Sequence, residues 1–171
     1  MVASYEEDFD AWGVASALVP KYFQPTLPII PIPKSVPKEV ADEMLAASGL
    51  FWSSPPSAGN RIRAAIERLM DERGIVKKAK TRKGGFVELT LHARIERFSE
   101  KNPELGTHLL AAKWLGNSGS HSDELTVEGV LDGLEVMNYV LTEVYEQTTA
   151  KLAKKSALIN KLKGPIKKKT K

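Results

Sequence analysis

The chain has 171 residues, about the size of one domain, and its 42% hydrophobic and 27% charged residues are ordinary for a folded globular protein. It has no cysteine, which excludes disulfides, thiolate metal sites and a cysteine nucleophile, and suits a reducing cytoplasm. No apolar run approaches the roughly 20 residues that span a bilayer, and the acidic start differs from the basic region of a secretion signal. We therefore expect a cytoplasmic protein without membrane contact.

The net charge of +4 is unevenly distributed along the chain. Nine of the 25 basic residues lie at positions 150–171, where there is no acidic residue, so the rest of the chain carries more acidic than basic groups. This lysine-rich helix and tail predicts contact with nucleic acid or an acidic partner. The alternative is a solvated segment that only aids solubility.

Residues 1–36 are predicted to be an extended arm. The stretch FQPTLPIIPIPKSVP is rich in proline, which removes backbone donors and disfavours a helix or a central strand. Free linkers seldom contain so many large aliphatic residues. We therefore expect the arm to pack on the folded body through Leu27, Ile29, Ile30 and Ile32.

A helical bundle is predicted over residues 37–149. Its first helix begins near Pro37. The second, over about 56–73, has an apolar stripe at helical spacing made of Ile62, Ala65, Ile66, Leu69 and Met70. Gly74 follows where a C-terminal cap glycine belongs.

Residues 75–86 are predicted to form a flexible loop that ends at Gly84 and Gly85. Basic residues are dense here, and together with one arginine of the second helix they are the candidate nucleic-acid contacts: Arg63, Lys77, Lys78, Lys80, Arg82 and Lys83.

Further helices are expected over about 90–100, 103–115, 126–147 and 149–162, with Thr126 as an N-cap. VELTL alternates like a short strand, but HARIERF continues it at helical spacing. The predicted fold class is therefore all-α, a bundle of five to six helices with an extended arm and a basic tail.

The connection KWLGNSGSH, residues 113–121, joins two helices and has two interpretations. As a turn, Gly116 and Asn117 suit left-handed positions at the end of a helix, and His121 links the turn to a neighbour. As a site, His121 exchanges a proton, Asn117 positions a phosphate and Lys113 faces an anion. These three residues are the candidate catalytic set.

A second constellation lies on the second predicted helix. Arg63 and Glu67 are four residues apart and can form an ion pair on one face, with Arg61 nearby. If it is exposed, the pair stabilises little. If it is partly buried, it can orient His121 or Asn117.

Metal and cofactor chemistry finds no support in the sequence. The three histidines, His92, His108 and His121, lack metal-binding spacing, and no phosphate-binding or dinucleotide-binding glycine motif is present. We expect no metal and no cofactor.

The segments RIRAAIERLMDERG, LHARIERF, LLAAKWLGNSGSH and LTVEGVLDGLEVMNYVLTEVY together resemble a bacterial domain family of unknown function. That family is grouped with the HEPN-like (higher eukaryotes and prokaryotes nucleotide-binding) superfamily, and the resemblance spans about residues 38–146. It implies a helical bundle, often dimeric, found alone or beside phage-defence proteins. Many members of the wider superfamily are metal-independent endoribonucleases, in which an arginine, a polar residue such as asparagine and a histidine from two copies build one composite site.

The sequence departs from that ribonuclease motif at one position. Asn117 and His121 match it, but Gly116 stands where the arginine belongs, and Lys113 lacks the bidentate fork of arginine. We therefore expect a HEPN-like module, non-catalytic or weakly active, that binds nucleic acid or dimerises in a bacterial defence or nucleic-acid-processing system. One alternative is an active endoribonuclease with Lys113 or Arg63 as its cation. Another is an adaptor that binds a protein partner from such a system.

Overall fold

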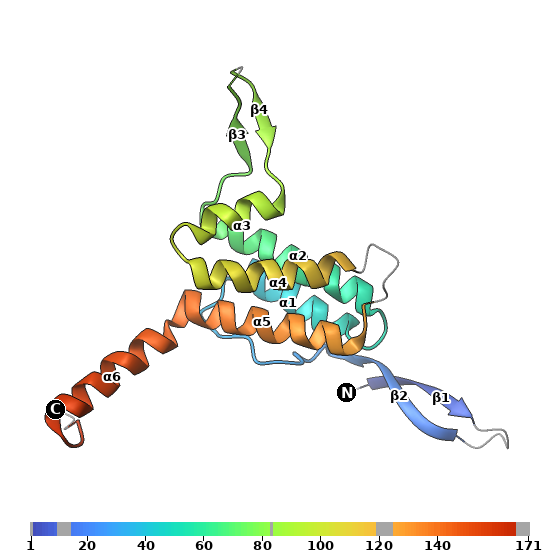
Figure 1. Cartoon of the computed structure of the whole chain (residues 1–171). Coiled ribbons are helices and arrows are strands. Elements are labelled where there is room, and N and C mark those ends of the chain that lie inside the picture. Colours follow the sequence, from blue (N-terminus) through green and yellow to red (C-terminus); the bar gives the residue numbers. More distant parts are fainter. Residues whose placement is uncertain (1, 10–14, 83, 119–124, 167–171) are drawn as a thin grey trace.

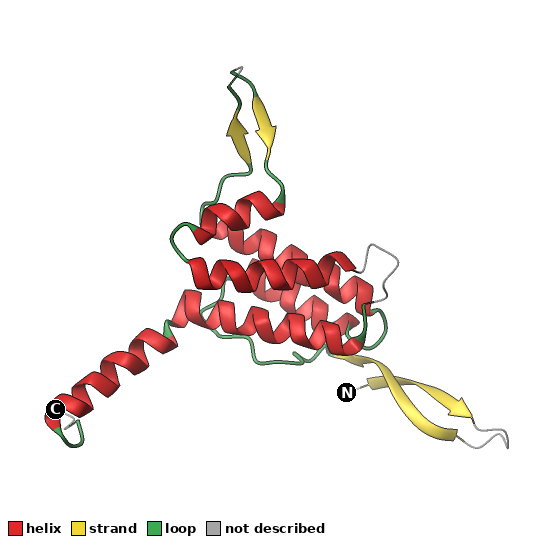
Figure 2. Ribbon diagram, viewed as in Figure 1, coloured by secondary structure: helices red, strands yellow, loops and turns green. Residues whose placement is uncertain are grey.

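The structure is a computed structural model that describes residues 2–9, 15–82, 84–118 and 125–166. Five of its helices pack together, a sixth leaves this body, and two β-hairpins project from it (Figures 1 and 2). The packed helices are α1 (Lys38–Leu50), α2 (Pro55–Glu72), α3 (Leu91–Ser99), α4 (Pro103–Ser118) and α5 (Val127–Glu146). None of the described helices is long and apolar enough to span a bilayer.

The core lies where the apolar faces of these five helices meet. Helix α2 is central because it packs against α1, α4 and α5. Its predicted stripe is confirmed, since Ile62, Ala65, Ile66, Leu69 and Met70 are all fully buried. The stripe of α5 also faces inward, with Val130, Leu134, Met137 and Leu141 buried. The prediction of a mostly helical fold is therefore correct.

The predicted helix ends are largely confirmed. The Thr126 hydroxyl accepts a hydrogen bond from the Gly129 amide at 3.2 Å, as expected of an N-cap. Gly74 ends α2 with a φ of 71°, a left-handed conformation that a residue with a Cβ rarely adopts. Thr90 caps α3 in the same way as Thr126 caps α5.

The N-terminal arm contains two strands that the sequence analysis did not predict. Strands β1 (Val2–Phe9) and β2 (Ala15–Gln24) pair antiparallel as a hairpin that points away from the helices (Figure 1). The proline-rich segment follows it. Here Ile29, Ile30 and Ile32 pack against the core, whereas Leu27 is exposed.

The predicted loop over 75–86 is a second hairpin, so this expectation is wrong. Strands β3 (Lys78–Lys80) and β4 (Phe86–Glu88) pair antiparallel and protrude beyond α3 (Figure 2). Strand β4 begins at Phe86 and ends at Glu88, within the alternating pattern VELTL that the helical interpretation set aside. Helix α3 starts only at Leu91, because Thr90 provides its cap.

Helix α4 continues through the predicted turn. Gly116 and Asn117 do not end the helix in left-handed conformations but remain helical, and α4 ends at Ser118. The reason is a close crossing with α2. A Cβ at Gly116 would lie 2.8 Å from the carbonyl oxygen of Gly59 and 3.2 Å from the Cβ of Arg63. Glycine is needed here for the approach of two backbones.

Helix α6 (Thr148–Leu162) continues from α5 and leaves the bundle (Figure 1). None of its residues is buried. The segment expected as a lysine-rich helix is helical, and its apolar side chains face solvent.

We expect Gly116→Ala to destabilise the fold, because its methyl group meets backbone rather than a movable side chain. The loss should be about 1–3 kcal/mol, as for overpacked cores, and thermal unfolding measures it as a lower Tm. Gly85→Ala in the exposed hairpin is the control, since its Cβ would meet only the Thr81 hydroxyl at 3.6 Å. Equal Tm values for both variants would contradict a tight crossing.

Candidate functional site

The crossing of α2 and α4 brings together residues that lie far apart in the sequence. Arg63 of α2 donates a hydrogen bond from Nη1 to Oδ1 of Asn117 on α4, at 2.7 Å. The Nε of Arg63 lies 3.5 Å from the Glu67 carboxylate, so the ion pair expected from the spacing is present. Both side chains of that pair are more than 40% exposed, so water screens it.

Lys113 lies on α4 one turn before Asn117 and is buried, with 7% of its surface exposed. Its ammonium lies 3.4 Å from the centre of the Trp114 ring, a cation–π distance. Burial lowers the pKa of Lys113, and the positive charge of Arg63 lowers it further. No carboxylate that the structure describes lies within ion-pair distance of it. Arg63, Lys113 and Asn117 are called the cationic cluster below.

Two of the predicted site residues cannot be placed. His121 and Lys83 lie outside the described residues. Arg61, expected to support the site, instead pairs with Glu43 of α1 at 3.2 Å. The structure thus brings together Arg63, Lys113 and Asn117 but not Arg61.

The predicted basic loop divides into paired and unpaired cations. Lys77 lies 2.9 Å from Asp71, and Lys78 lies 3.6 Å from Glu88 across the hairpin. Lys80 and Arg82 are exposed and form no ion pair with another described residue. These two remain as cations of the hairpin that a polyanion could contact.

Arg94 is the charged residue that sequence reasoning missed. Its Nη2 donates to Asp71 Oδ1 at 2.7 Å and to the Ile75 carbonyl at 2.8 Å, while only 5% of the residue is exposed. It thereby ties α3 to the end of α2. The sequence feature that could have predicted its burial is its helical spacing between Leu91 and Phe98, which places it on the inward face of α3.

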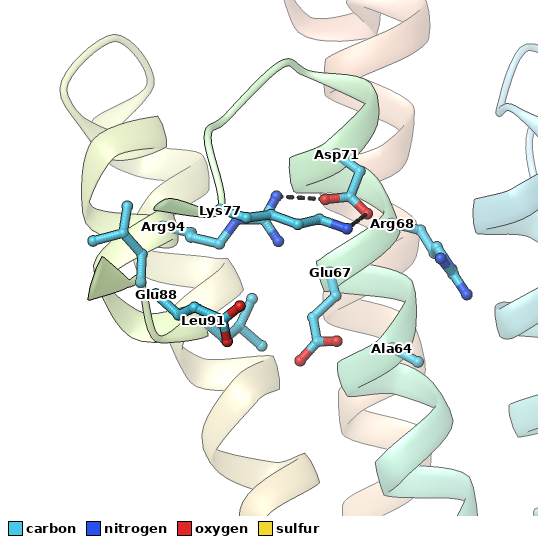
Figure 3. A pocket seen from close by; sticks show the side chains of 9 residues that line it. Ala64, Glu67, Arg68, Asp71, Lys77, Glu88, Leu91 and Arg94 are labelled. Atoms are coloured by element: carbon cyan, nitrogen blue, oxygen red, sulfur yellow. Dashed lines mark hydrogen bonds and ion pairs between the residues drawn. The ribbon is translucent and has the colours of Figure 1, made fainter. Parts of the chain in front are cut away.

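Figure 3 shows that Arg94 and Lys77 both reach Asp71, beside a shallow hollow of about 280 Å³. Burial alone would raise the pKa of Asp71, but hydrogen bonds from Lys77 and Arg94 outweigh it, and the pKa is lowered. Because the cations and carboxylates here neutralise one another, this hollow is a structural junction.

No group of three or more histidine, aspartate or glutamate residues in the described part of the chain is arranged to hold a metal ion. The cationic cluster offers hydrogen-bond donors and positive charge, which suit an anion rather than a metal cation.

Comparison with known families shows to which family the chain belongs. The model of a domain of unknown function (DUF4145) matches residues 46–163, which is more than half of the chain. The chain belongs to this family. No curated protein and no solved structure gives a significant match.

We expect Arg94→Met to lower the free energy of unfolding by roughly 2–3 kcal/mol, because it leaves the Ile75 carbonyl and one oxygen of Asp71 without their donor. It should also weaken the acid dependence of stability. The lowered pKa of Asp71 stabilises the fold above its ordinary value of 3.8 and ceases to do so as pH falls through the folded pKa. Urea unfolding between pH 2 and 6 measures both effects.

Arg97→Met on the same helix is the control, since Arg97 forms no ion pair with a described residue. If Arg94→Met and Arg97→Met unfold alike at every pH, Arg94 does not tie α3 to α2.

Proposed function

We propose that this DUF4145 protein is a HEPN-like helical module that binds nucleic-acid phosphates, as part of a bacterial defence or nucleic-acid-processing system. The observation that carries the proposal is the cationic cluster: Lys113 is buried beside Arg63 without a carboxylate among the described residues. Burying a cation next to another cation is unfavourable in a free protein. A bound phosphate would offset that cost.

The chemistry of the cluster fits a phosphate better than a carboxylate-bearing metabolite. Arg63 already uses Nη1 for Asn117 and Nε for Glu67, so it would offer a phosphate its remaining N–H donors, and Lys113 offers a point charge. Asn117 is fixed by its bond from Arg63, at 2.7 Å. Its side-chain oxygen is occupied by that bond, so its NH₂ group is left to donate to a ligand.

The hairpin β3–β4 provides a second contact of suitable chemistry. Lys80 and Arg82 lie near its tip, and Phe86 is 73% exposed on the opposite strand. A protruding element with cations and an exposed aromatic ring matches how proteins hold single strands, by phosphate contacts and base stacking. The hairpin and the cluster would contact different parts of one polymer.

If α4 carries a HEPN-like motif, the close helix crossing accounts for the glycine in place of its arginine. A side chain at Gly116 would crowd the backbone of α2, because its Cβ would lie 2.8 Å from the Gly59 oxygen. Arg63, arriving from α2, places a guanidinium at Asn117 instead. The motif would thus be completed from a second helix rather than from the preceding residue.

A metal-independent endoribonuclease is the second candidate, and the Arg63–Asn117 contact favours it. In such a reaction a base takes the proton of the ribose 2′-OH, the oxygen attacks the adjacent phosphorus, and the 5′-oxygen leaves with a proton from an acid. Arg63 and Lys113 would stabilise the charge on the phosphorane. His121 would serve as the base or the acid.

We expect Lys113→Met and Arg63→Met each to weaken the binding of a labelled single-stranded RNA about tenfold, the effect of losing one charge-assisted contact of ~1.5 kcal/mol. The salt dependence of log Kd should also fall by about one phosphate contact. Fluorescence anisotropy at several salt concentrations measures both quantities.

Arg61→Met is the matched control, because Arg61 lies on the same helix and pairs with Glu43. It should bind like the wild type. Wild-type affinity in the Lys113→Met and Arg63→Met variants would remove the cluster from the binding surface.

The second candidate requires cleavage of labelled RNA in EDTA. If the protein is a ribonuclease, His121→Ala should abolish cleavage without changing RNA affinity, since a proton-transferring residue acts in the transition state. Gel analysis of the products measures this. Intact RNA after prolonged incubation with the folded wild type would contradict the ribonuclease and leave the nucleic-acid-binding module as the one remaining proposal.

A further inference from the structure

Helix α6 has the features of a helix that lacks its packing partner. It runs for 15 residues without one buried side chain and contacts α5 at its base (Figure 1). Isolated helices of this length are marginally stable in water. Its exposed apolar residues are large: Leu152 is 64% exposed, and Leu158, Ile159 and Leu162 are also open to solvent.

The two halves of α6 differ in chemistry. At 100° per residue, all four lysines and all four large aliphatic residues fall on one half of the helix: Lys151, Leu152, Lys154, Lys155, Leu158, Ile159, Lys161 and Leu162. The other half carries small or neutral residues such as Ala153, Ser156, Ala157 and Asn160. The first half therefore suits a surface that is both acidic and apolar.

The junction with α5 holds α6 away from its own body. Gln147 has a left-handed backbone, with φ 51° and ψ 45°, which breaks the helix between α5 and α6. The Glu143 carboxylate accepts hydrogen bonds from the Thr148 hydroxyl and from the Thr149 amide, the latter at 3.1 Å. It thus caps α6 and fixes its direction, so α6 does not fold back onto its own α5.

An acidic surface with one exposed aromatic ring lies on α5. This helix contains five acidic residues and no lysine or arginine. Glu128, Asp132 and Glu135 follow one another at helical spacing on its outer face and form no ion pair with any described residue. Tyr139 continues the same face and is 37% exposed.

We propose that α6 of one copy docks on the acidic outer face of α5 in a second copy, and that the exchange is reciprocal, giving a two-fold dimer. Lys154 and Lys161 are seven residues apart, as are Glu128 and Glu135, so both pairs span about 10 Å along their helices. A two-fold axis lets both α6–α5 contacts form at once, because each copy contributes one basic helix and one acidic face. This inference does not depend on nucleic-acid binding.

Other occupants fit α6 less well. A second α6 would bring eight lysines together without an acid, so the two helices would repel. A phosphate backbone would satisfy the lysines but leave the aliphatic side chains exposed. An anionic lipid surface would cover both, yet it would repel the acidic face of α5.

The test uses charge reversal in the full chain. Analytical ultracentrifugation of the wild type at low salt should give twice the protomer mass. Lys154→Glu/Lys161→Glu and Asp132→Lys/Glu135→Lys should each give the protomer mass. An equimolar mixture of the two variants should restore the dimer, because each α6 in a mixed dimer again faces an α5 of opposite charge. Native mass spectrometry should find one copy of each variant in it.

Ser156→Glu/Asn160→Glu, which adds two negative charges on the other half of α6, is the control and should remain dimeric. A monomeric wild type, a dimeric reversal variant or a mixture that stays monomeric would overturn the proposal. So would a monomeric wild type whose α6 reversal instead abolishes binding to RNA or to anionic vesicles, which would assign α6 to that ligand.

Discussion

The close approach of α2 and α4 is the constraint on which the rest of this structure depends. Gly116 allows the two backbones to come near enough that a methyl group would lie 2.8 Å from the Gly59 oxygen. That distance keeps α4 helical past the predicted turn and brings Arg63 within 2.7 Å of Asn117. The same glycines that allow the packing therefore also create the cationic cluster.

The buried cations near the two ends of α2 differ in whether a described carboxylate neutralises them. Near its C-terminus, the buried Arg94 is neutralised by Asp71, and Lys77 adds a second contact. At the crossing with α4, Lys113 has an aromatic ring and a neighbouring arginine instead of a described carboxylate. The first arrangement stabilises the fold without a ligand, whereas under the proposed function the second would be stabilised by a bound anion.

The sequence predicted what depends on local periodicity and missed what depends on distant contacts. The stripe from Ile62 to Met70 is buried because an apolar face must meet another. Gly116 resembles a helix end locally, and only the approach of Gly59 makes it helical. The sequence did not predict the hairpin β3–β4, because a three-residue strand such as Phe86–Glu88 is too short to show the alternation of a strand. Asn117 and Lys113 were named from the sequence, but the contact of Arg63 with Asn117 joins residues 54 positions apart.

The most direct test of the cationic cluster is a nuclear magnetic resonance titration of the full chain with a short single-stranded RNA. The side-chain Nε–H signal of Arg63 and the side-chain amide signal of Asn117 report on the two helices separately. We expect both to shift and saturate together, because one phosphate contacts both groups. Saturating shifts of the hairpin and α6 signals, with both of these signals unmoved, would contradict a phosphate site between α2 and α4.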